Sequence, residues 1–320
     1  MKKKILVTGA NGLVGYAIRE ESKKYLDKYD FIFATREDAD LTDRAACENL
    51  FKSSGAEICI GLAAKVGGLG GHLIGSADYF YQNLLMGANV INSARIFGVK
   101  KLLIFSSVCV FPENLEILQE DKMHDGPPFA LNAPYAHSKR VQDIFIQALK
   151  KQHGVENYCS IIPSNIIGCG DLYDLSHGHV LPCLIHKMYL AKRDNTPFKV
   201  WGTGRARREF LLSSDIADIL MRLVDMEKPI PDRLVIAGDI QYSISDIVQF
   251  LVEAADFKGE VVYESDKPDG QMNRRSDISR LMNLFPDFKH TPVKEAVRIS
   301  YQWFSDRYPN VRLIAPESKL

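Results

Sequence analysis

Tyr135 and Lys139 lie four positions apart in the run Tyr135-Ala-His-Ser-Lys139, so on a helix their side chains would share one face. An ordinary tyrosine titrates near ~10 and gives up its proton poorly at neutral pH. A nearby ammonium stabilises the phenolate and would lower the pKa of the tyrosine, which would make it a better acid catalyst. A solvent-exposed tyrosine and lysine on a helix have the same spacing. The rest of the sequence must therefore show whether this pair is catalytic or lies on the surface.

The N-terminal segment predicts a nucleotide site. The apolar run Ile5-Leu6-Val7 is followed by Thr8-Gly9-Ala10-Asn11-Gly12-Leu13-Val14-Gly15, which predicts a strand, a glycine turn and the start of a helix. Gly9 would permit the tight turn, Gly12 would let a pyrophosphate approach the backbone, and Gly15 would let the helix pack on the strand. An ordinary strand-to-helix turn is the alternative, but the position directly after one N-terminal strand favours a dinucleotide site.

The end of the second expected strand, Phe31-Ile32-Phe33-Ala34-Thr35, indicates which dinucleotide binds. Arg36 follows this strand, at the place where an acidic residue would bind a free ribose hydroxyl, and a guanidinium suits the 2′-phosphate of NADPH. A solvated loop arginine is the alternative, because two acidic residues come next. Asp40 and Leu41 end this polar loop and are expected to border the adenine. The segment therefore predicts NADPH/NADP+ rather than NADH.

Composition limits the function classes. The chain has 320 residues, 46% of them hydrophobic, and no apolar run long enough to span a bilayer. We therefore expect no membrane partner. Lys plus Arg and Asp plus Glu number 40 each, so we expect no nucleic-acid partner either. Six cysteines without a Cys-x-x-Cys pair are typical of a reducing cytoplasm. Three apolar residues before the glycine turn are too few for a signal peptide, so a cytoplasmic location is expected.

Alternating strands and helices in the first half predict the fold. Apolar runs predict strands at 31–35, 58–63, 101–106 and 158–163, and helical periodicity predicts helices near 42–53 and 76–97 and around Tyr135. The apolar residues at helical spacing in this last helix are Val141, Ile144, Phe145, Ala148 and Leu149. The pattern is that of an α/β protein with a doubly wound parallel sheet of Rossmann type.

From about residue 166 glycines and prolines make the pattern irregular, which predicts a smaller C-terminal α/β substrate domain over the carboxyl ends of the strands. Residues 1–165 and about 209–240 are expected to form the NADP-binding domain. Residues 166–208 and 241–320 are expected to form the substrate-binding domain, with the substrate between the two.

A further polar cluster follows the strand expected at 101–106. The run is Ser106-Ser107-Val108-Cys109-Val110-Phe111-Pro112, and a doubly wound sheet places catalytic groups at this edge. Ser107 completes a Ser-Tyr-Lys constellation with Tyr135 and Lys139. Alternatively, Cys109 is a small apolar side chain that only packs in the core.

With these residues in place, the sequence resembles the extended short-chain dehydrogenase/reductase family, and within it the GDP-L-fucose synthase branch, over almost the whole chain. Seven segments in family order carry the resemblance: Ala63-Ala64-Lys65-Val66-Gly67-Gly68-Leu69, Ser107-Val108-Cys109-Val110-Phe111-Pro112, Asn132-Ala133-Pro134-Tyr135, Gly178-His179-Val180-Leu181-Pro182, Val200-Trp201-Gly202-Thr203-Gly204, Arg208-Glu209-Phe210 and Lys267-Pro268-Asp269-Gly270-Gln271.

The resemblance implies an NADPH-dependent epimerase and oxidoreductase that converts GDP-4-keto-6-deoxy-D-mannose to GDP-L-fucose by 3,5-epimerisation and 4-keto reduction. Cys109 and His179 match the base and acid that move the protons beside the keto group, while the Ser-Tyr-Lys constellation matches the reductase site. His177 beside His179 invites a zinc site, but two histidines without a third ligand hold zinc poorly, so no metal is expected.

The resemblance also implies binding residues. Cofactor contacts are expected at Gly9, Asn11, Gly12, Leu13, Val14, Gly15, Arg36, Asp40, Leu41, Leu62, Ala63, Ala64, Tyr135, Lys139, Pro163, Asn165, Ile166 and His179. Substrate contacts are expected at Lys187, Trp201, Arg208, Lys267 and Asp269. The alternatives are a surface charge for Arg208, which has two arginine neighbours, and a plain turn for Lys267 and Asp269.

Two other functions remain open. The family usually has a Gly-Pro-His-Asp-Asn-like stretch where this chain has Gly168-Cys169-Gly170-Asp171-Leu172, so an epimerase/reductase of another nucleotide-linked 4-keto sugar is the alternative enzyme. A non-catalytic NADPH-sensing module is the third reading, but it would be expected to have lost Tyr135, Lys139 or Cys109.

A homodimer is expected, because family members pair two long helices, here about 76–97 and 135–152, across a two-fold axis. Four apolar residues of the first helix would serve in that contact or against the sheet: Tyr79, Phe80, Leu84 and Leu85.

Overall fold

A computed structural model describes residues 2–68, 75–176, 178–267 and 274–313. The helices are α1 (Leu13–Glu21), α2 (Arg44–Ser54), α4 (Ser76–Ile96), α5 (Ala133–His153), α6 (Val180–Asp194), α7 (Ser213–Asp225), α8 (Ile244–Ala255), α9 (Ser279–Leu284) and α10 (Val293–Arg307). The strands are β1 (Lys3–Thr8), β2 (Tyr29–Ala34), β3 (Ile58–Gly61), β4 (Lys101–Phe105), β5 (Ile117–Leu118), β6 (Tyr158–Pro163), β7 (Asn165–Ile167), β8 (Phe198–Trp201), β9 (Arg207–Leu212), β10 (Arg233–Ile236), β11 (Gln241–Ser243), β12 (Val261–Glu264) and β13 (Arg275–Ser276).

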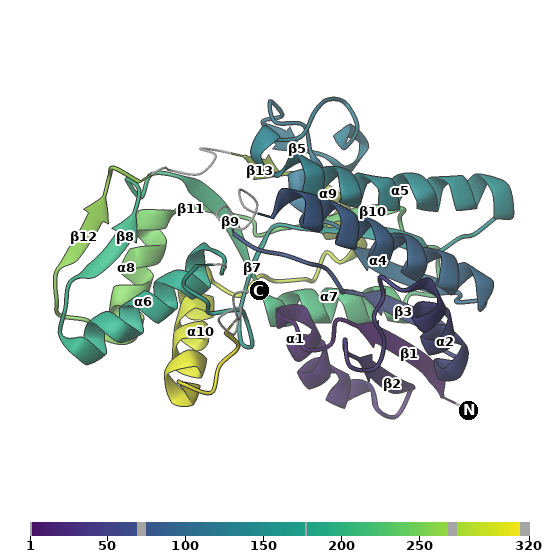
Figure 1. The fold of residues 1–320 in the computed structure, drawn as a ribbon, viewed down its shortest axis with the longest axis horizontal. Coiled ribbons are helices and arrows are strands. Elements are labelled where there is room, and N and C mark those ends of the chain that lie inside the picture. The colour runs from purple at the N-terminus through teal and green to yellow at the C-terminus, as the bar shows by residue number, and fades with distance from the viewer. Residues whose placement is uncertain (1, 69–74, 177, 268–273, 314–320) are drawn as a thin grey trace.

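Six parallel strands form the central sheet, in the order β10-β6-β4-β3-β1-β2 (Figure 1). The chain goes from β1 to β2 on one side and then returns to place β3 on the other side of β1. This reversal opens a crevice at the carboxyl ends of β1 and β3, which is where open α/β sheets bind their ligands. The predicted doubly wound parallel sheet is confirmed.

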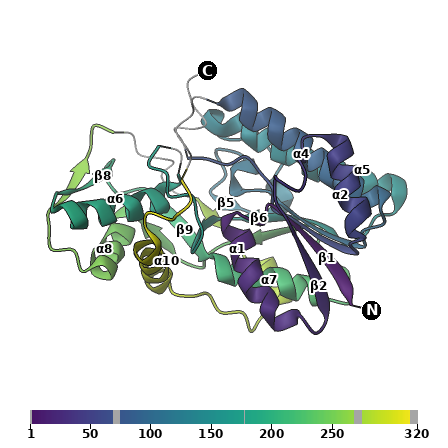
Figure 2. The same cartoon turned by 60° about the horizontal axis from the view of Figure 1, so that its bottom comes forward.

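Helices cover both faces of this sheet. Apolar residues of α2, α4 and α5 pack on one face, and those of α1, α7 and α9 pack on the other (Figure 2). Because both faces are covered, the central strands β3, β4 and β6 are buried along their whole length. Their near-continuous apolar sequences are typical of such strands.

The part of the chain after β6 builds a second lobe around its own core. Helices α6, α8 and α10 pack there against the paired strands β8 and β12 and against the sheet β11-β9-β7 (Figure 1). Leu281, Phe285 and Phe288 instead pack into the core beneath the six-stranded sheet. The domain boundaries given above stay a prediction.

Helix α5 presents two different apolar surfaces. Ile146 and Leu149 are buried against the sheet, whereas Val141 is 38% exposed and Ile144 is 55% exposed. The helical spacing of the apolar residues therefore does not mark one core-facing side. Helix α4 lies beside α5 (Figure 1). Its Tyr81 is 62% exposed, while its Tyr79 is buried within the protomer. In the part of the chain that the structure describes, no helix is both long and apolar enough to cross a bilayer.

Candidate active site

A cleft of about 950 Å³ opens at the carboxyl ends of the sheet strands, between the sheet and the second lobe. It brings together every residue predicted for catalysis or cofactor binding, and Arg208 of the predicted substrate residues. The lining includes Ser107, Cys109, Tyr135, Lys139 and His179, together with Gly9, Asn11, Gly12, Leu13, Val14, Gly15, Arg36, Asp40, Leu41, Leu62, Ala63, Ala64, Pro163, Asn165 and Ile166.

The glycine turn after β1 fits a dinucleotide pyrophosphate. Gly9 has a φ of +69°, and a Cβ on it would lie 2.7 Å from the backbone nitrogen of Ala63. A Cβ on Gly15 would lie 2.5 Å from the carbonyl oxygen of Ala10, so α1 packs here without room for a side chain. Gly12 occupies the N-cap of α1 and brings no side chain between the helix N-terminus and the cleft. The backbone N–H groups at this terminus can therefore approach an anion.

Arg36 stands at the same end of the cleft with its side chain 86% exposed. Its nearest carboxylate is that of Asp40, 3.7 Å away. That carboxylate already accepts hydrogen bonds from the N–H and hydroxyl of Thr42, at 3.0 and 2.7 Å. Because the acid is engaged by its own loop, the guanidinium keeps donors available for the 2′-phosphate of NADPH.

Tyr135 and Lys139 lie on the buried side of α5, with only 6% and 2% of their surface exposed. The Lys139 ammonium donates to the carbonyl oxygen of Phe105, at the end of β4, over 2.8 Å. Burial lowers the pKa of Lys139 to about 7.

The pKa of Tyr135 is raised, contrary to the expectation that Lys139 would lower it. Burial is the main cause, because the phenolate would lose its hydration, and the thiol of Cys109 adds to the effect. A hydrogen bond with Ser107 opposes the rise. The phenol is therefore protonated at neutral pH and holds its proton more tightly than a solvent-exposed tyrosine does.

Cys109 lies in a short 3₁₀ helix, Val108–Val110, directly after β4. Its N–H donates to Oγ of Ser107 over 3.2 Å, and its Sγ accepts a hydrogen bond from Nδ2 of Asn132 over 3.2 Å. Burial raises the pKa of the thiol, whereas Ser107, Asn132 and two nearby guanidinium groups oppose that rise. The polar partners and the position in the cleft favour a chemical role over that of a small core hydrophobe.

His179 is the N-cap residue of α6 and lines the cleft. The residue is exposed toward the cleft, but the walls around its ring limit hydration and lower its pKa. His177, its predicted neighbour in a zinc site, lies outside the described residues. Among the residues that are described, no group of three or more His, Cys, Asp or Glu is arranged to hold a metal ion.

The predicted substrate residues fall into two groups. Arg208 lines the cleft, and burial together with the charge of Arg274 lowers its pKa. In the second lobe, the Lys187 ammonium lies over the Trp201 ring, 4.6 Å from its centre. Within the described chain, neither of these two residues lines the cleft, and neither does Lys267. Asp269 lies outside the described residues.

The sequence analysis gave no site role to several polar or charged cleft residues, among them Asn132, Asp171, Arg274 and Arg312. Asn132 stood in a family motif but had no assigned role. Asp171 is 6% exposed, and burial raises the pKa of its carboxyl group to about 7. Arg274 and Arg312 are contributed by segments far along the chain, and no local motif marks them.

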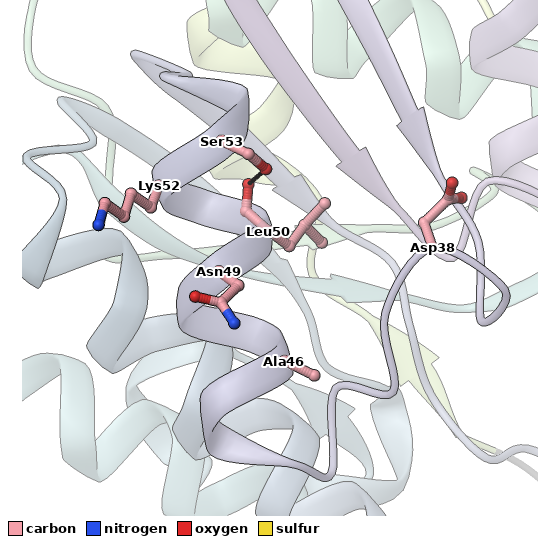
Figure 3. A pocket seen from close by; sticks show the side chains of 6 residues that line it. All are labelled: Asp38, Ala46, Asn49, Leu50, Lys52 and Ser53. Atoms are coloured by element: carbon pink, nitrogen blue, oxygen red, sulfur yellow. Dashed lines mark hydrogen bonds between the residues drawn. The ribbon is translucent and has the colours of Figure 1, made fainter.

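A separate pocket of about 690 Å³ lies between α2 and the loop after β2 (Figure 3). Asp38 faces Ala46, Asn49 and Leu50 of the helix across it, and Lys52 and Ser53 complete the lining. The Asp38 carboxylate accepts hydrogen bonds from the N–H and hydroxyl of Thr35. The carboxylate of Asp38 therefore serves its own turn.

Comparisons with known proteins agree with this geometry. Residues 5–237 match the NAD dependent epimerase/dehydratase family. The chain is 35% identical to the GDP-L-fucose synthase of Dictyostelium discoideum, over 97% of this chain and 98% of that protein. The crystal structure of a GDP-L-fucose synthetase from Naegleria fowleri bound to NADP is 33% identical, with a TM-score of 0.90 over 97% of this chain and 95% of that one. A GDP-6-OMe-4-keto-L-xylo-heptose reductase from C. jejuni is 25% identical, with a TM-score of 0.86 over 95% and 98%.

Proposed function

Because the chain belongs to the NAD dependent epimerase/dehydratase family, and within it to the GDP-L-fucose synthases, we propose that it converts GDP-4-keto-6-deoxy-D-mannose to GDP-L-fucose. The reaction comprises 3,5-epimerisation and NADPH-dependent reduction of the 4-keto group. One observation carries the proposal: a single cleft holds a thiol and an imidazole suited to proton transfer beside a Ser-Tyr-Lys reductase site.

In the epimerisation, Cys109 as a thiolate takes the proton from the carbon next to the keto group. The electron pair of that C–H bond moves into the enolate, and His179 returns a proton to the opposite face. The two residues then exchange protons with solvent, and the sequence repeats at the second carbon. A thiolate and an imidazole suit these steps because both titrate nearer neutrality than a hydroxyl does.

Bound NADPH supplies the hydride for the reduction at C4. Tyr135, which lines the cleft next to Ser107, donates its proton to the C4 oxygen as negative charge develops there. Ser107, which is hydrogen-bonded to Tyr135, donates to the same oxygen. Lys139, held against the Phe105 carbonyl, orients the nicotinamide ribose.

Backbone N–H groups and positively charged side chains bind the phosphate groups of the cofactor and the substrate. The glycine turn and the N-terminus of α1 receive the cofactor pyrophosphate, and Arg36 receives its 2′-phosphate. Arg208 binds the diphosphate of the nucleotide sugar. We assign Lys187, Trp201, Lys267 and Asp269 to contacts with the rest of the GDP-sugar, as the family resemblance implies.

Identification of the product tests the proposal. The protein is incubated with NADPH and GDP-4-keto-6-deoxy-D-mannose, and the sugar product is identified by NMR. GDP-L-fucose is the expected product. An unepimerised 4-hydroxy sugar, or turnover only with another nucleotide-linked 4-keto sugar, would favour the alternative enzyme, for which the C. jejuni reductase is a precedent. Binding of NADPH without turnover of any such sugar would favour the sensing module.

We also propose a homodimer that pairs α4 and α5 of two protomers. Four large apolar side chains on these helices are exposed, namely Tyr81, Ile96, Val141 and Ile144. A second copy of the same two helices would cover them across a two-fold axis.

A cytoplasmic location is consistent with six cysteines that are all free thiols.

A further inference from the structure

The thiol of Cys109 is surrounded by groups from distant parts of the chain. Ser107 and Asn132 are its hydrogen-bonding partners, at 3.2 Å each. The titratable and charged groups that act on it are Arg274, Arg208 and Tyr135. Arg274 has no role in the function proposed above, although it lines the same cleft.

Burial works against the chemistry that Cys109 must perform. It raises the pKa of the thiol, and only the thiolate can take a proton from carbon. Positive charge close to the sulfur counteracts this effect. Of the two guanidinium groups that do so, that of Arg274 has the larger influence.

The position of Arg274 is fixed from two sides. Its Nη2 donates to the carbonyl oxygen of Pro112, three residues after Cys109, over 2.8 Å. Its own carbonyl oxygen accepts a hydrogen bond from Nε2 of Gln241 over 2.5 Å. Directly after it, β13 pairs with β5, so the backbone is tied to the segment that follows the cysteine. The charge is therefore held beside the loop of Cys109.

Arg208 and Arg274 have different charged neighbours during the proposed reaction. In the proposed function it binds the substrate diphosphate, whose negative charge offsets its own. Arg274 is instead anchored on the uncharged carbonyl of Pro112, and both Cys109 and the carboxylate of Glu113 are close enough to act on its charge. The field that favours the thiolate in the substrate complex would then come mainly from Arg274.

We propose that Arg274 is a positioning residue of the epimerisation step, which holds a guanidinium beside Cys109 and stabilises the thiolate that acts as base. This inference rests on the proposed function for the role of Cys109. The stabilisation itself is a property of the protein without substrate, so it can be measured even if the sugar is a different one.

The test is the pH dependence of Cys109 alkylation by iodoacetamide in the full-length protein, followed by mass spectrometry of the peptide that contains Cys109. Arg274→Gln keeps an N–H donor for the Pro112 carbonyl and removes the charge. We expect the midpoint of alkylation to rise by on the order of 1 pH unit in this variant. Arg274→Lys, which keeps the charge, should restore most of the unmutated profile.

Arg275→Gln is the matched control, because it removes the same charge from the exposed neighbour on β13 and should leave the midpoint unchanged. An unchanged midpoint in Arg274→Gln would overturn the proposal, and a raised KM for the GDP-sugar alone would make Arg274 a substrate-binding residue. Loss of NADPH binding in Arg274→Gln would also count against it, since the arginine would then be a structural support. If neither the unmutated protein nor any variant epimerises the sugar, but the midpoint of Cys109 alkylation still rises in Arg274→Gln, the proposed function is refuted. This inference then still holds.

Discussion

The side-chain amide of Asn132 donates a hydrogen bond to the sulfur of Cys109 over 3.2 Å. Asn132 is also the N-cap residue of α5, the helix that carries Tyr135. This one contact joins the loop of the proposed base to the helix of the proposed acid. The two chemistries of the reaction therefore share a structural support.

Asn132→Ala should slow proton exchange beside the keto group by about 10- to 100-fold, because a hydrogen bond to a charged group contributes about 1.5–3 kcal/mol. The thiolate loses a donor in this variant, while the cofactor contacts stay. The measurement is deuterium uptake by the substrate in D2O. Unchanged uptake, with unchanged binding of NADPH, would show that the contact does not support the base.

Arg36→Ala should reduce the affinity for NADPH by about 10- to 100-fold and leave the affinity for NADH unchanged, because one charge-assisted contact to the 2′-phosphate is lost. Fluorescence titration with both cofactors measures the two affinities. Equal affinity of the unmutated protein for NADPH and NADH would contradict the role of Arg36. Lys52→Ala, a cation on the outer face of α2, is a suitable control.

Asp171→Asn should stabilise the protein at alkaline pH. The pKa of Asp171 is about 7 in the folded protein and near 3.8 in the unfolded chain, so the folded state binds this proton more tightly. Its ionisation lowers the free energy of unfolding as the pH rises from about 4 to 7, by at most about 4 kcal/mol. The amide cannot ionise and avoids this loss.

Urea unfolding at pH 5 and pH 8 checks the Asp171 prediction. The stability gain of Asp171→Asn should be larger at pH 8 than at pH 5. A gain that is the same at both pH values would mean that the carboxylate is ionised without penalty.

Ile144→Glu should convert the proposed dimer into a monomer, because it puts a charge on an exposed apolar position of α5. Light scattering at micromolar concentration reports the mass. Leu26→Glu, at a residue that is 52% exposed elsewhere, should leave the dimer intact. A monomer mass for the unmutated protein would refute the dimer.

Local patterns in the sequence predicted much of the fold. Strand β6 was predicted with its observed bounds, and β3 and α2 within two residues at each end, because long apolar runs and helical periods leave few choices. The exposure of Val141 and Ile144 could not be predicted, because periodicity does not show which apolar side faces the protomer's own core. The helices α6, α8 and α10 were hidden by the irregular spacing of glycines and prolines after residue 166.

The candidate site was predicted where its residues form local motifs. Gly9, Gly12 and Gly15 line the cleft, and so do Tyr135 and Lys139. The pKa shift of Tyr135 was predicted with the wrong sign, because the sequence shows a lysine four residues away but not the burial of the phenol, which is the main cause of the shift. Arg274 was missed because only the folded chain brings it to the loop of Cys109.

The central claim is that one cleft performs two separable chemistries, with Cys109 serving proton transfer and Tyr135 serving the reduction. Tyr135→Phe should keep exchanging the protons beside the keto group, while NADPH oxidation falls by about 10²-fold or more.

The most direct measurement is deuterium incorporation at C3 and C5 of GDP-4-keto-6-deoxy-D-mannose by Cys109→Ser in D2O, compared with the unmutated protein. A hydroxyl is a far weaker base than a thiolate, so this variant should bind NADPH and the GDP-sugar but incorporate no deuterium above background. Incorporation at the unmutated rate would contradict the account, because Cys109 would then be a packing residue and the protein a simple 4-keto reductase.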